Sequence, residues 1–159
     1  MRHESELLVP GFGRPVMFPR GMIPRTRGMA AFARDSYGVF RQPKFECRRR
    51  EMLVFMVRGV KQNLYVFSLY RSPDLDDRIF YCLLASIAAV QTEDMRASFL
   101  FVGDLNVHHQ EWLGFTTSKR HGVAAFDFAP VSGCHQLVVG PTHACGGTLD
   151  LLMTGVPDL

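Results

Sequence analysis

The fold is decided by the stretch SFLFVGDLN, residues 98–106, in which a continuous apolar run meets a polar turn. A short apolar run without alternation is typical of a strand that is buried on both faces. Gly103 ends the run, and Asp104 and Asn106 follow two positions apart. Open α/β sheets bind ligands at such strand ends, so we expect the functional site there.

The segments before this strand predict a β-hairpin followed by a helix. Residues 51–58 (EMLVFMVR) and 63–70 (NLYVFSLY) are rich in strand-forming residues, and the turn-like segment 59–62 separates them. Residues 72–77 (SPDLDD) have the composition of a helix start. Apolar residues then recur at three- and four-residue spacing over 79–90, which predicts one buried helix face.

The remaining segments complete the pattern of a layered domain. Residues 28–34 are β-rich, residues 122–131 predict a short helix, and residues 136–139 and 148–153 predict strands. This mixed order of strands and helices indicates an α/β domain. Residues 1–26 hold four prolines and show no clear periodicity, so we expect an irregular N-terminal segment.

Composition and charge exclude several classes of protein. With 47% hydrophobic and 21% charged residues, the chain has the composition of a folded globular protein. Its longest apolar runs fall short of the ~20 residues of a membrane-spanning helix, and no secretory signal is visible. We therefore expect an intracellular protein without membrane contact, and nothing in the sequence indicates an oligomer.

Basic residues are concentrated in the first part of the chain. Residues 1–61 carry 13 Lys and Arg against 5 Asp and Glu. The run Arg48-Arg49-Arg50 is either a contact surface for phosphates or a solvated strand edge, and short basic runs are more often the latter.

The four cysteines, Cys47, Cys82, Cys134 and Cys145, form no closely spaced pair, and no export signal places them in an oxidising compartment. We expect free thiols. A zinc site built from Cys134, His135, His143 and Cys145 is an alternative, although this spacing matches no common structural zinc site.

Asp104 and Asn106 can carry chemistry, because residues two apart on an extended chain project to the same side. One oxygen can accept a proton from water while the other orients the water or a phosphate, and adjacent oxygen ligands suit Mg²⁺. The alternative is a plain turn, since Gly, Asp and Asn are all turn formers.

Several motifs in order give the sequence a resemblance to the endonuclease/exonuclease/phosphatase superfamily, in the branch of non-long-terminal-repeat retrotransposon endonucleases. The three main motifs are YRSP at residues 70–73, GDLN at 103–106 and TLDLLM at 148–153. The segments HHQEW at 108–112 and GPTH at 140–143 are similar to two further elements of that branch.

The resemblance implies a fold and a reaction for residues 27–159. The fold would be part of a four-layered α/β sandwich of the DNase I-like type, with two packed mixed sheets flanked by helices. The reaction would be Mg²⁺-dependent hydrolysis of a DNA phosphodiester, so DNA is the expected partner and Mg²⁺ the expected cofactor of the complete domain.

The resemblance also implies roles for individual residues. Tyr70 would contact the scissile phosphate, Asp104 would orient the attacking water and weakly hold the metal, and Asn106 would help to position the water and bind substrate. Asp150 would orient a catalytic histidine. Arg71 and His108 would contribute to substrate binding.

Each of these residues also has a plainer explanation. Tyr70 is alternatively a half-buried strand aromatic, and Trp112 is more often an anchor for its loop. His108 and His109 would then order their loop. We interpret His121, His135 and His143 as surface or loop residues.

Two motifs of the superfamily are absent from the 159 residues. These are the Gln-Glu-Thr element, whose Glu binds the metal, and the Ser-Asp-His element, which supplies the catalytic histidine. We therefore interpret the sequence as the central portion of a DNA endonuclease, nuclear if functional, with little or no activity by itself. The alternatives are an inert nucleic-acid-binding remnant and a phosphatase of the same superfamily.

The resemblance also leads to a geometric prediction. We predict that Tyr70, Asp104, Asn106 and Asp150 meet at one edge of the sheets, because each lies at or near a strand end.

Overall fold

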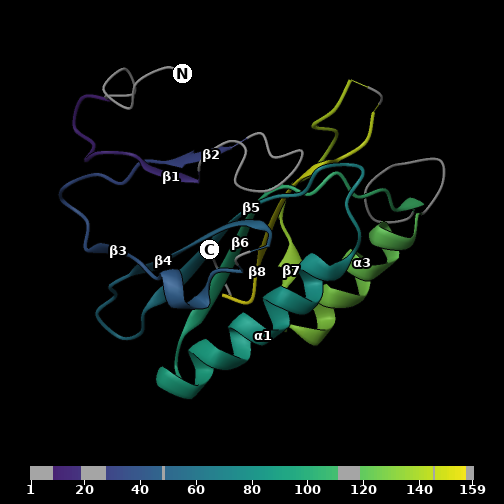
Figure 1. Ribbon diagram of the computed structural model, residues 1–159. Coiled ribbons are helices and arrows are strands. Elements are labelled where there is room, and N and C mark those ends of the chain that lie inside the picture. Colours follow the sequence, from purple (N-terminus) through teal and green to yellow (C-terminus); the bar gives the residue numbers. More distant parts are fainter. Residues whose placement is uncertain (1–8, 19–27, 48, 111–118, 145, 157–159) are drawn as a thin grey trace.

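The computed structural model describes residues 9–18, 28–47, 49–110, 119–144 and 146–156. A six-stranded mixed sheet forms its centre, with strand order β3-β4-β5-β6-β8-β7, and a separate two-stranded sheet pairs β1 with β2 (Figure 1). In chain order the elements are β1 (Val16–Phe18), β2 (Met29–Ala31), β3 (Val39–Arg41), the 3-10 helix η2 (Pro43–Phe45), β4 (Glu51–Val57), β5 (Leu64–Tyr70), α1 (Arg78–Glu93), β6 (Ser98–Asp104), α3 (Arg120–Val131), β7 (His135–Gln136) and β8 (Asp150–Thr154).

Pairing within the sheet follows from the connections between the strands. A short turn joins β4 to β5, so these strands form an antiparallel hairpin with Glu51 opposite Tyr70. A helix joins β5 to β6, so these strands run parallel, as a crossover connection requires. Strand β8 then pairs antiparallel with β6. The carboxyl ends of β5 and β6 and the start of β8 therefore meet at one edge.

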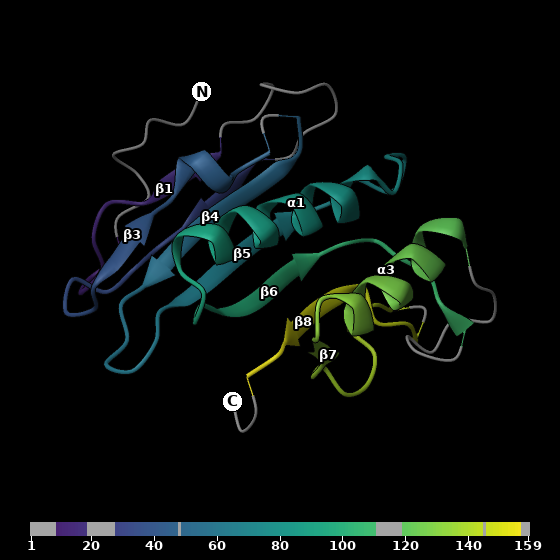
Figure 2. The same cartoon turned by 90° about the horizontal axis from the view of Figure 1, so that it is seen from below.

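The main hydrophobic core lies between the sheet and the two helices α1 and α3, which run side by side along the same face (Figure 2). Phe67 and Phe101 on the central strands are fully buried. Phe101 meets Phe128 of α3 edge to face, with ring centroids 5.4 Å apart, and Phe80 of α1 lies 5.7 Å from the same ring. Aromatic contacts therefore join both helices to the sheet.

The opposite face of the sheet carries a second, smaller core. Leu53 and Phe55 of β4 are buried there beneath Val16 and Met29 of the two-stranded sheet. A groove of about 790 Å³ continues between these strands and the half-buried side of β5 and β6, where Val66 is one of its lining residues. The described part of the chain thus has three layers: helices, a large sheet and a small sheet.

The fold class predicted from the sequence is confirmed, with differences in detail. Helix α1 begins at Arg78 with Asp77 at its N-cap, several residues later than the SPDLDD segment predicts. The carbonyls of Leu75 and Asp76 accept hydrogen bonds from the Arg71 side chain, so these residues form a turn instead of the first helical turn. Within the segment expected to be irregular, Val16–Phe18 forms a strand because it pairs with Met29–Ala31.

Among the described residues, no helix is long and apolar enough to span a bilayer.

The aromatic core supplies a test of the packing. Phe101→Ala removes a fully buried ring that contacts both β5 and α3, and should lower the free energy of unfolding by about 3–5 kcal/mol. Tyr81→Ala on the outer side of α1, where Tyr81 is 70% exposed, should change it by about 0.5 kcal/mol or less. Urea denaturation of the two variants measures both values, and equal losses would contradict this description of the core.

Candidate active site

A row of polar residues crosses the sheet at the edge where β5, β6 and β8 meet. Tyr70 pairs with Asp104, and Asp104 pairs with Asp150. Paired residues on neighbouring strands point to the same face and lie about 5 Å apart. Successive side chains of β6 point to opposite faces of the sheet, and Phe101 points to the helices. Asp104, three positions later, therefore points to the other face, and the row lies on the face opposite the helices. The structure therefore brings these three residues together, while their catalytic roles stay predictions.

The turn that follows β6 is built around Gly103 and Asn106. A Cβ atom on Gly103 would lie 1.8 Å from the carbonyl oxygen of Leu69, so only glycine allows β5 to approach this closely. Asn106 has a φ of 47°, in the left-handed region that asparagine tolerates better than most residues. Its backbone N–H donates to Asp104 Oδ1 at 3.1 Å, and this bond fixes the orientation of the Asp104 carboxylate.

Arg71 ties this turn to the end of β5. Its backbone N–H donates to the Asp104 carbonyl at 2.9 Å, and its own carbonyl accepts a hydrogen bond from Asn106 Nδ2 at 2.9 Å. The guanidinium donates to the carbonyls of Leu105 and Asn106 at 3.2 Å, and also to those of Leu75 and Asp76. Arg71 is only 1% exposed, and burial lowers the pKa of its side chain. Its observed contacts therefore order two loops, and its predicted contact with substrate stays a prediction.

The Gly-Pro-Thr-His segment positions the beginning of β8. The Thr142 hydroxyl oxygen accepts hydrogen bonds from the backbone N–H groups of Leu149 at 2.9 Å and Asp150 at 3.1 Å. The Thr148 hydroxyl donates to the Gly140 carbonyl at 2.7 Å. These bonds close the loop on itself, so this segment holds Asp150 opposite Asp104.

The histidines beyond the turn lie against α3. The His108 and His121 rings meet edge to face with centroids 6.3 Å apart, and His109 stacks on Phe126 at 4.5 Å. Burial lowers the pKa of His121 to about 4, with smaller contributions from Arg71 and other nearby positive charge. Burial likewise lowers the pKa of His108. His121 is therefore neutral at pH 7, and His108 is more readily deprotonated there than a free imidazole.

One member of the row was missed by sequence reasoning. Glu51 at the start of β4 pairs with Tyr70, so the row continues as Glu51, Tyr70, Asp104 and Asp150 across four adjacent strands. Glu51 is 2% exposed, and its Oε1 accepts a hydrogen bond from the Gly28 N–H at 2.8 Å. Its Oε2 is buried and has no hydrogen-bond partner within the described part of the chain. The sequence signal was a lone carboxylate opening the apolar run EMLVFMV.

The carboxylates of the row do not by themselves fit a magnesium site. Mg²⁺ requires near-octahedral oxygen coordination and is held by carboxylates together with waters or phosphates. Among the residues that the structure describes, no three His, Cys, Asp or Glu side chains are grouped closely enough to hold a metal ion. This applies equally to Cys134, His135 and His143 of the alternative zinc site, whose fourth member, Cys145, lies outside the described residues.

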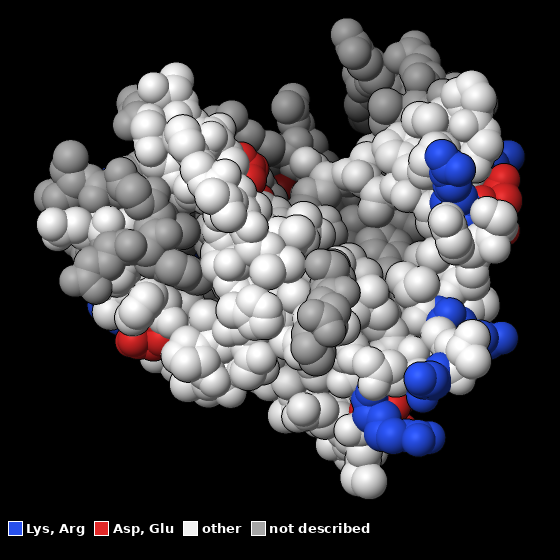
Figure 3. Space-filling model, turned by 180° about the vertical axis from the view of Figure 1, so that it is seen from behind, with Lys and Arg blue, Asp and Glu red and all other residues white. Residues whose placement is uncertain are grey.

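Part of the basic cluster is already neutralised. Arg50 forms an ion pair with Asp76 at 2.7 Å and donates to the Arg49 carbonyl at 2.9 Å, and its side chain is 14% exposed. Arg48 lies outside the described residues. Viewed from behind, the Lys and Arg side chains lie mainly along one side of the molecule (Figure 3). Arg50 is therefore poorly placed to bind phosphate.

The fold and the matching sequence together identify the family. The chain belongs to the endonuclease-reverse transcriptase family, whose model matches residues 64–158. Among solved structures it is similar to the "Endonuclease domain of TRAS1, a telomere-specific non-LTR retrotransposon", with 22% identity and a TM-score of 0.60, covering 79% of this chain and 58% of that one. It is also similar to truncated Caenorhabditis elegans TDP2, with 10% identity and a TM-score of 0.50, covering 80% of this chain and 56% of that one.

These findings confirm the resemblance inferred from the motifs. The chain spans less than two thirds of the length of either solved structure. No curated protein matches the sequence significantly. At such identities the structural likeness establishes the fold.

Arg71 provides a test of how the two loops are held. Arg71→Met keeps most of the side-chain volume but leaves buried carbonyls without their donor, so the free energy of unfolding should fall by about 3 kcal/mol. Arg78→Met is the matched control, because the Arg78 side chain is 75% exposed and should lose about 0.5 kcal/mol or less. Equal stabilities of the two variants, measured by chemical denaturation, would show that the Arg71 contacts contribute little.

His121 predicts a specific pH dependence of stability. The folded pKa of about 4 lies below the ordinary value of 6.5, so the unfolded chain binds more protons between these values. This contribution to stability is complete above pH 6.5 and is lost as the pH falls towards 4. His121→Gln should therefore lose less stability than the unsubstituted chain between pH 7 and pH 4.5. Urea midpoints measured over this range check the prediction, and parallel curves would refute it.

Proposed function

We infer that the chain is the central portion of a metal-dependent DNA endonuclease domain and that the 159 residues by themselves do not cleave DNA. The observation that carries this inference is the row Tyr70, Asp104 and Asp150, in register on three neighbouring strands. Family membership supports a nuclease-like reaction, and the similarity to the endonuclease domain of TRAS1, itself a non-LTR retrotransposon, supports a retrotransposon context. In that context the complete protein would act in the nucleus.

The row can perform part of the hydrolysis of a phosphodiester. The Asp104 carboxylate is oriented by the Asn106 N–H, so it can accept a hydrogen bond from an attacking water or remove its proton. On the neighbouring strand β5, the Tyr70 hydroxyl can donate a hydrogen bond to a phosphoryl oxygen of the substrate. Because the Asn106 amide donates to the Arg71 carbonyl, its side-chain oxygen is left to orient a water or a phosphate contact.

The position of Asp150 supports the proposal that the complete catalytic site also needs a histidine. A carboxylate in this position orients a histidine in the superfamily, and no Ser-Asp-His element occurs in the 159 residues. The Gln-Glu-Thr element is also absent. Since cooperating catalytic groups act as a unit, loss of one typically lowers the rate by several orders of magnitude.

An activity measurement tests the proposal directly. The 159-residue chain should not nick supercoiled plasmid in Mg²⁺, and a chain extended through both missing elements should do so. In the extended chain, Asp104→Ala should reduce nicking by roughly a thousandfold or more. Asp127→Ala on the exposed side of α3 is the matched control and should leave nicking unchanged.

Three results would contradict the proposal. Nicking by the unextended chain that Asp104→Ala abolishes would show that residues already present complete the catalytic set. Salt-dependent DNA binding by the extended chain without any nicking would instead favour an inert nucleic-acid-binding protein. Hydrolysis of a small phosphorylated substrate in place of plasmid would favour a phosphatase.

A further inference from the structure

The segment formed by η2 and the described residues that lead into β4 lies along helix α1. Four contacts join the two. As the segment runs forward in sequence, its partners run backward along α1 and into the turn before it. They are the ion pair of Lys44 with Glu93, the hydrogen bond from Ser86 Oγ to the Phe45 carbonyl at 2.8 Å, the contact of Cys47 Sγ with Cys82 Sγ at 2.9 Å, and the ion pair of Arg50 with Asp76 at 2.7 Å.

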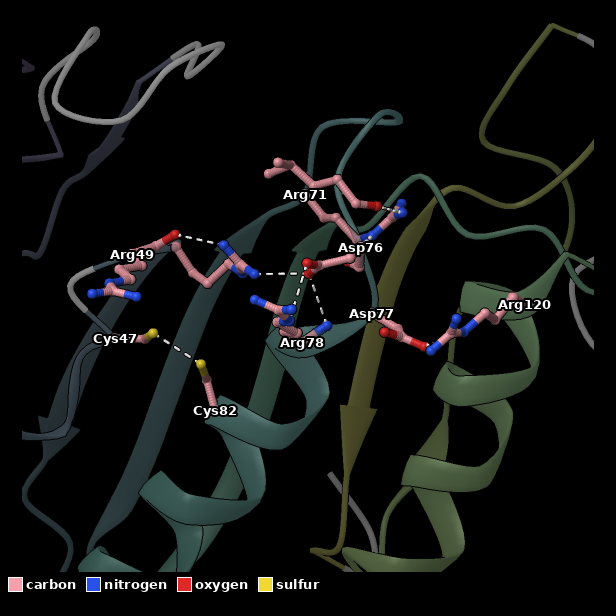
Figure 4. Close-up of polar contacts among 10 residues, drawn as sticks. Cys47, Arg49, Arg71, Asp76, Asp77, Arg78, Cys82 and Arg120 are labelled. Atoms are coloured by element: carbon pink, nitrogen blue, oxygen red, sulfur yellow. Dashed lines mark hydrogen bonds and ion pairs between the residues drawn. The ribbon is translucent and has the colours of Figure 1, made fainter.

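The position of Cys47 is therefore fixed by contacts of residues before and after it in the segment. Phe45 is buried in the main core on one side of Cys47, and Arg50 is anchored to Asp76 on the other. Cys47 and Cys82 point towards each other across the gap between the segment and the helix (Figure 4). Both are free thiols, and neither is fully buried. Because a disulfide bond is about 2.05 Å long, the sulfurs need to approach by less than 1 Å to form one.

We propose that Cys47 and Cys82 form an oxidation site, at which a peroxide converts the two thiols into an intramolecular disulfide. The Cys47 thiol loses its proton, the thiolate attacks hydrogen peroxide and the O–O bond breaks; Cys47 becomes a sulfenic acid, and the departing hydroxide takes up that proton as one water. Cys82 Sγ then attacks Cys47 Sγ, the S–O bond breaks, and the hydroxide leaves as a second water with the Cys82 proton. Two electrons pass from the thiols to the peroxide.

The surroundings of Cys82 indicate which thiol reacts with peroxide first. Burial, and then the contact with Cys47, raise the pKa of the Cys82 thiol to about 11, so Cys82 stays protonated at pH 7. The thiolate is the nucleophile in reactions of cysteine with peroxide. Cys47 therefore reacts first, and Cys82 resolves the sulfenic acid. This oxidation site is independent of the proposed nuclease function.

Peptide mapping of the full chain tests the proposal. Reduced protein is treated with stoichiometric hydrogen peroxide, alkylated and digested with trypsin, which releases Cys47 in residues 45–48 and Cys82 in residues 79–96. These two peptides should be joined in the monomer and should separate on reduction. The melting temperature should rise by roughly 5–10 °C on oxidation, because the cross-link restricts the unfolded chain.

Two substitutions complete the test. Cys134→Ser is the matched control, because Cys134 is buried and its thiol donates to the Ser132 carbonyl, so this variant should form the same cross-link. Cys47→Ser should form none and should show no rise in melting temperature, and Cys47→Ala replaces it if the serine variant does not fold. Any of three results would overturn the proposal. The first is sulfinic acid on Cys47 without a cross-link, the second is a disulfide with Cys134 or between chains, and the third is a cross-link that lowers the melting temperature.

Discussion

The arrangement of the candidate site depends on one buried cation, the guanidinium of Arg71. A buried charge is costly unless hydrogen bonds replace its lost hydration. Here carbonyls of the turn after β6 and of the loop before α1 accept those hydrogen bonds. Neither loop can move without leaving donors of Arg71 unsatisfied. The Asp104–Asn106 turn is therefore held at the end of β5, and the start of α1 is displaced to Arg78 for the same reason.

The sheet supplies the second condition for the site, which is register. Because side chains alternate along a strand, a shift of one residue would move Asp104 to the helix face and Phe101 to the opposite face. The aromatic contacts of Phe101 with Phe67 and Phe128 resist such a shift. The same core that stabilises the domain thus keeps Tyr70, Asp104 and Asp150 on one face. The position of the site follows from packing, whereas its chemistry follows from the residues at the strand ends.

Much of this arrangement could be predicted from the sequence because the signals are local. The uninterrupted run before Gly103 and the periodicity of residues 79–90 predict a strand and an amphipathic helix, and both are present, although β6 is fully buried on one face and not on both. The motif order also placed Tyr70, Asp104 and Asp150 together. The roles of Arg71 and Glu51 could not be predicted, because they depend on which backbone groups approach them from distant segments. A buried arginine and an exposed one have the same appearance in a sequence.

Three features that cost free energy lie in the row and its turn. Carboxylates occupy directly paired positions at Asp104 and Asp150, and like charges there are unfavourable. Asn106 adopts a left-handed conformation, and Glu51 buries an oxygen that has no hydrogen-bond partner in the described structure. Elsewhere the central strands are apolar on both faces, as in residues 52–57 of β4 and 99–102 of β6. Sequences that otherwise agree with their fold tend to break local rules at functional sites. The concentration of three such costs on one edge therefore supports chemistry, rather than stability, as the reason for these residues.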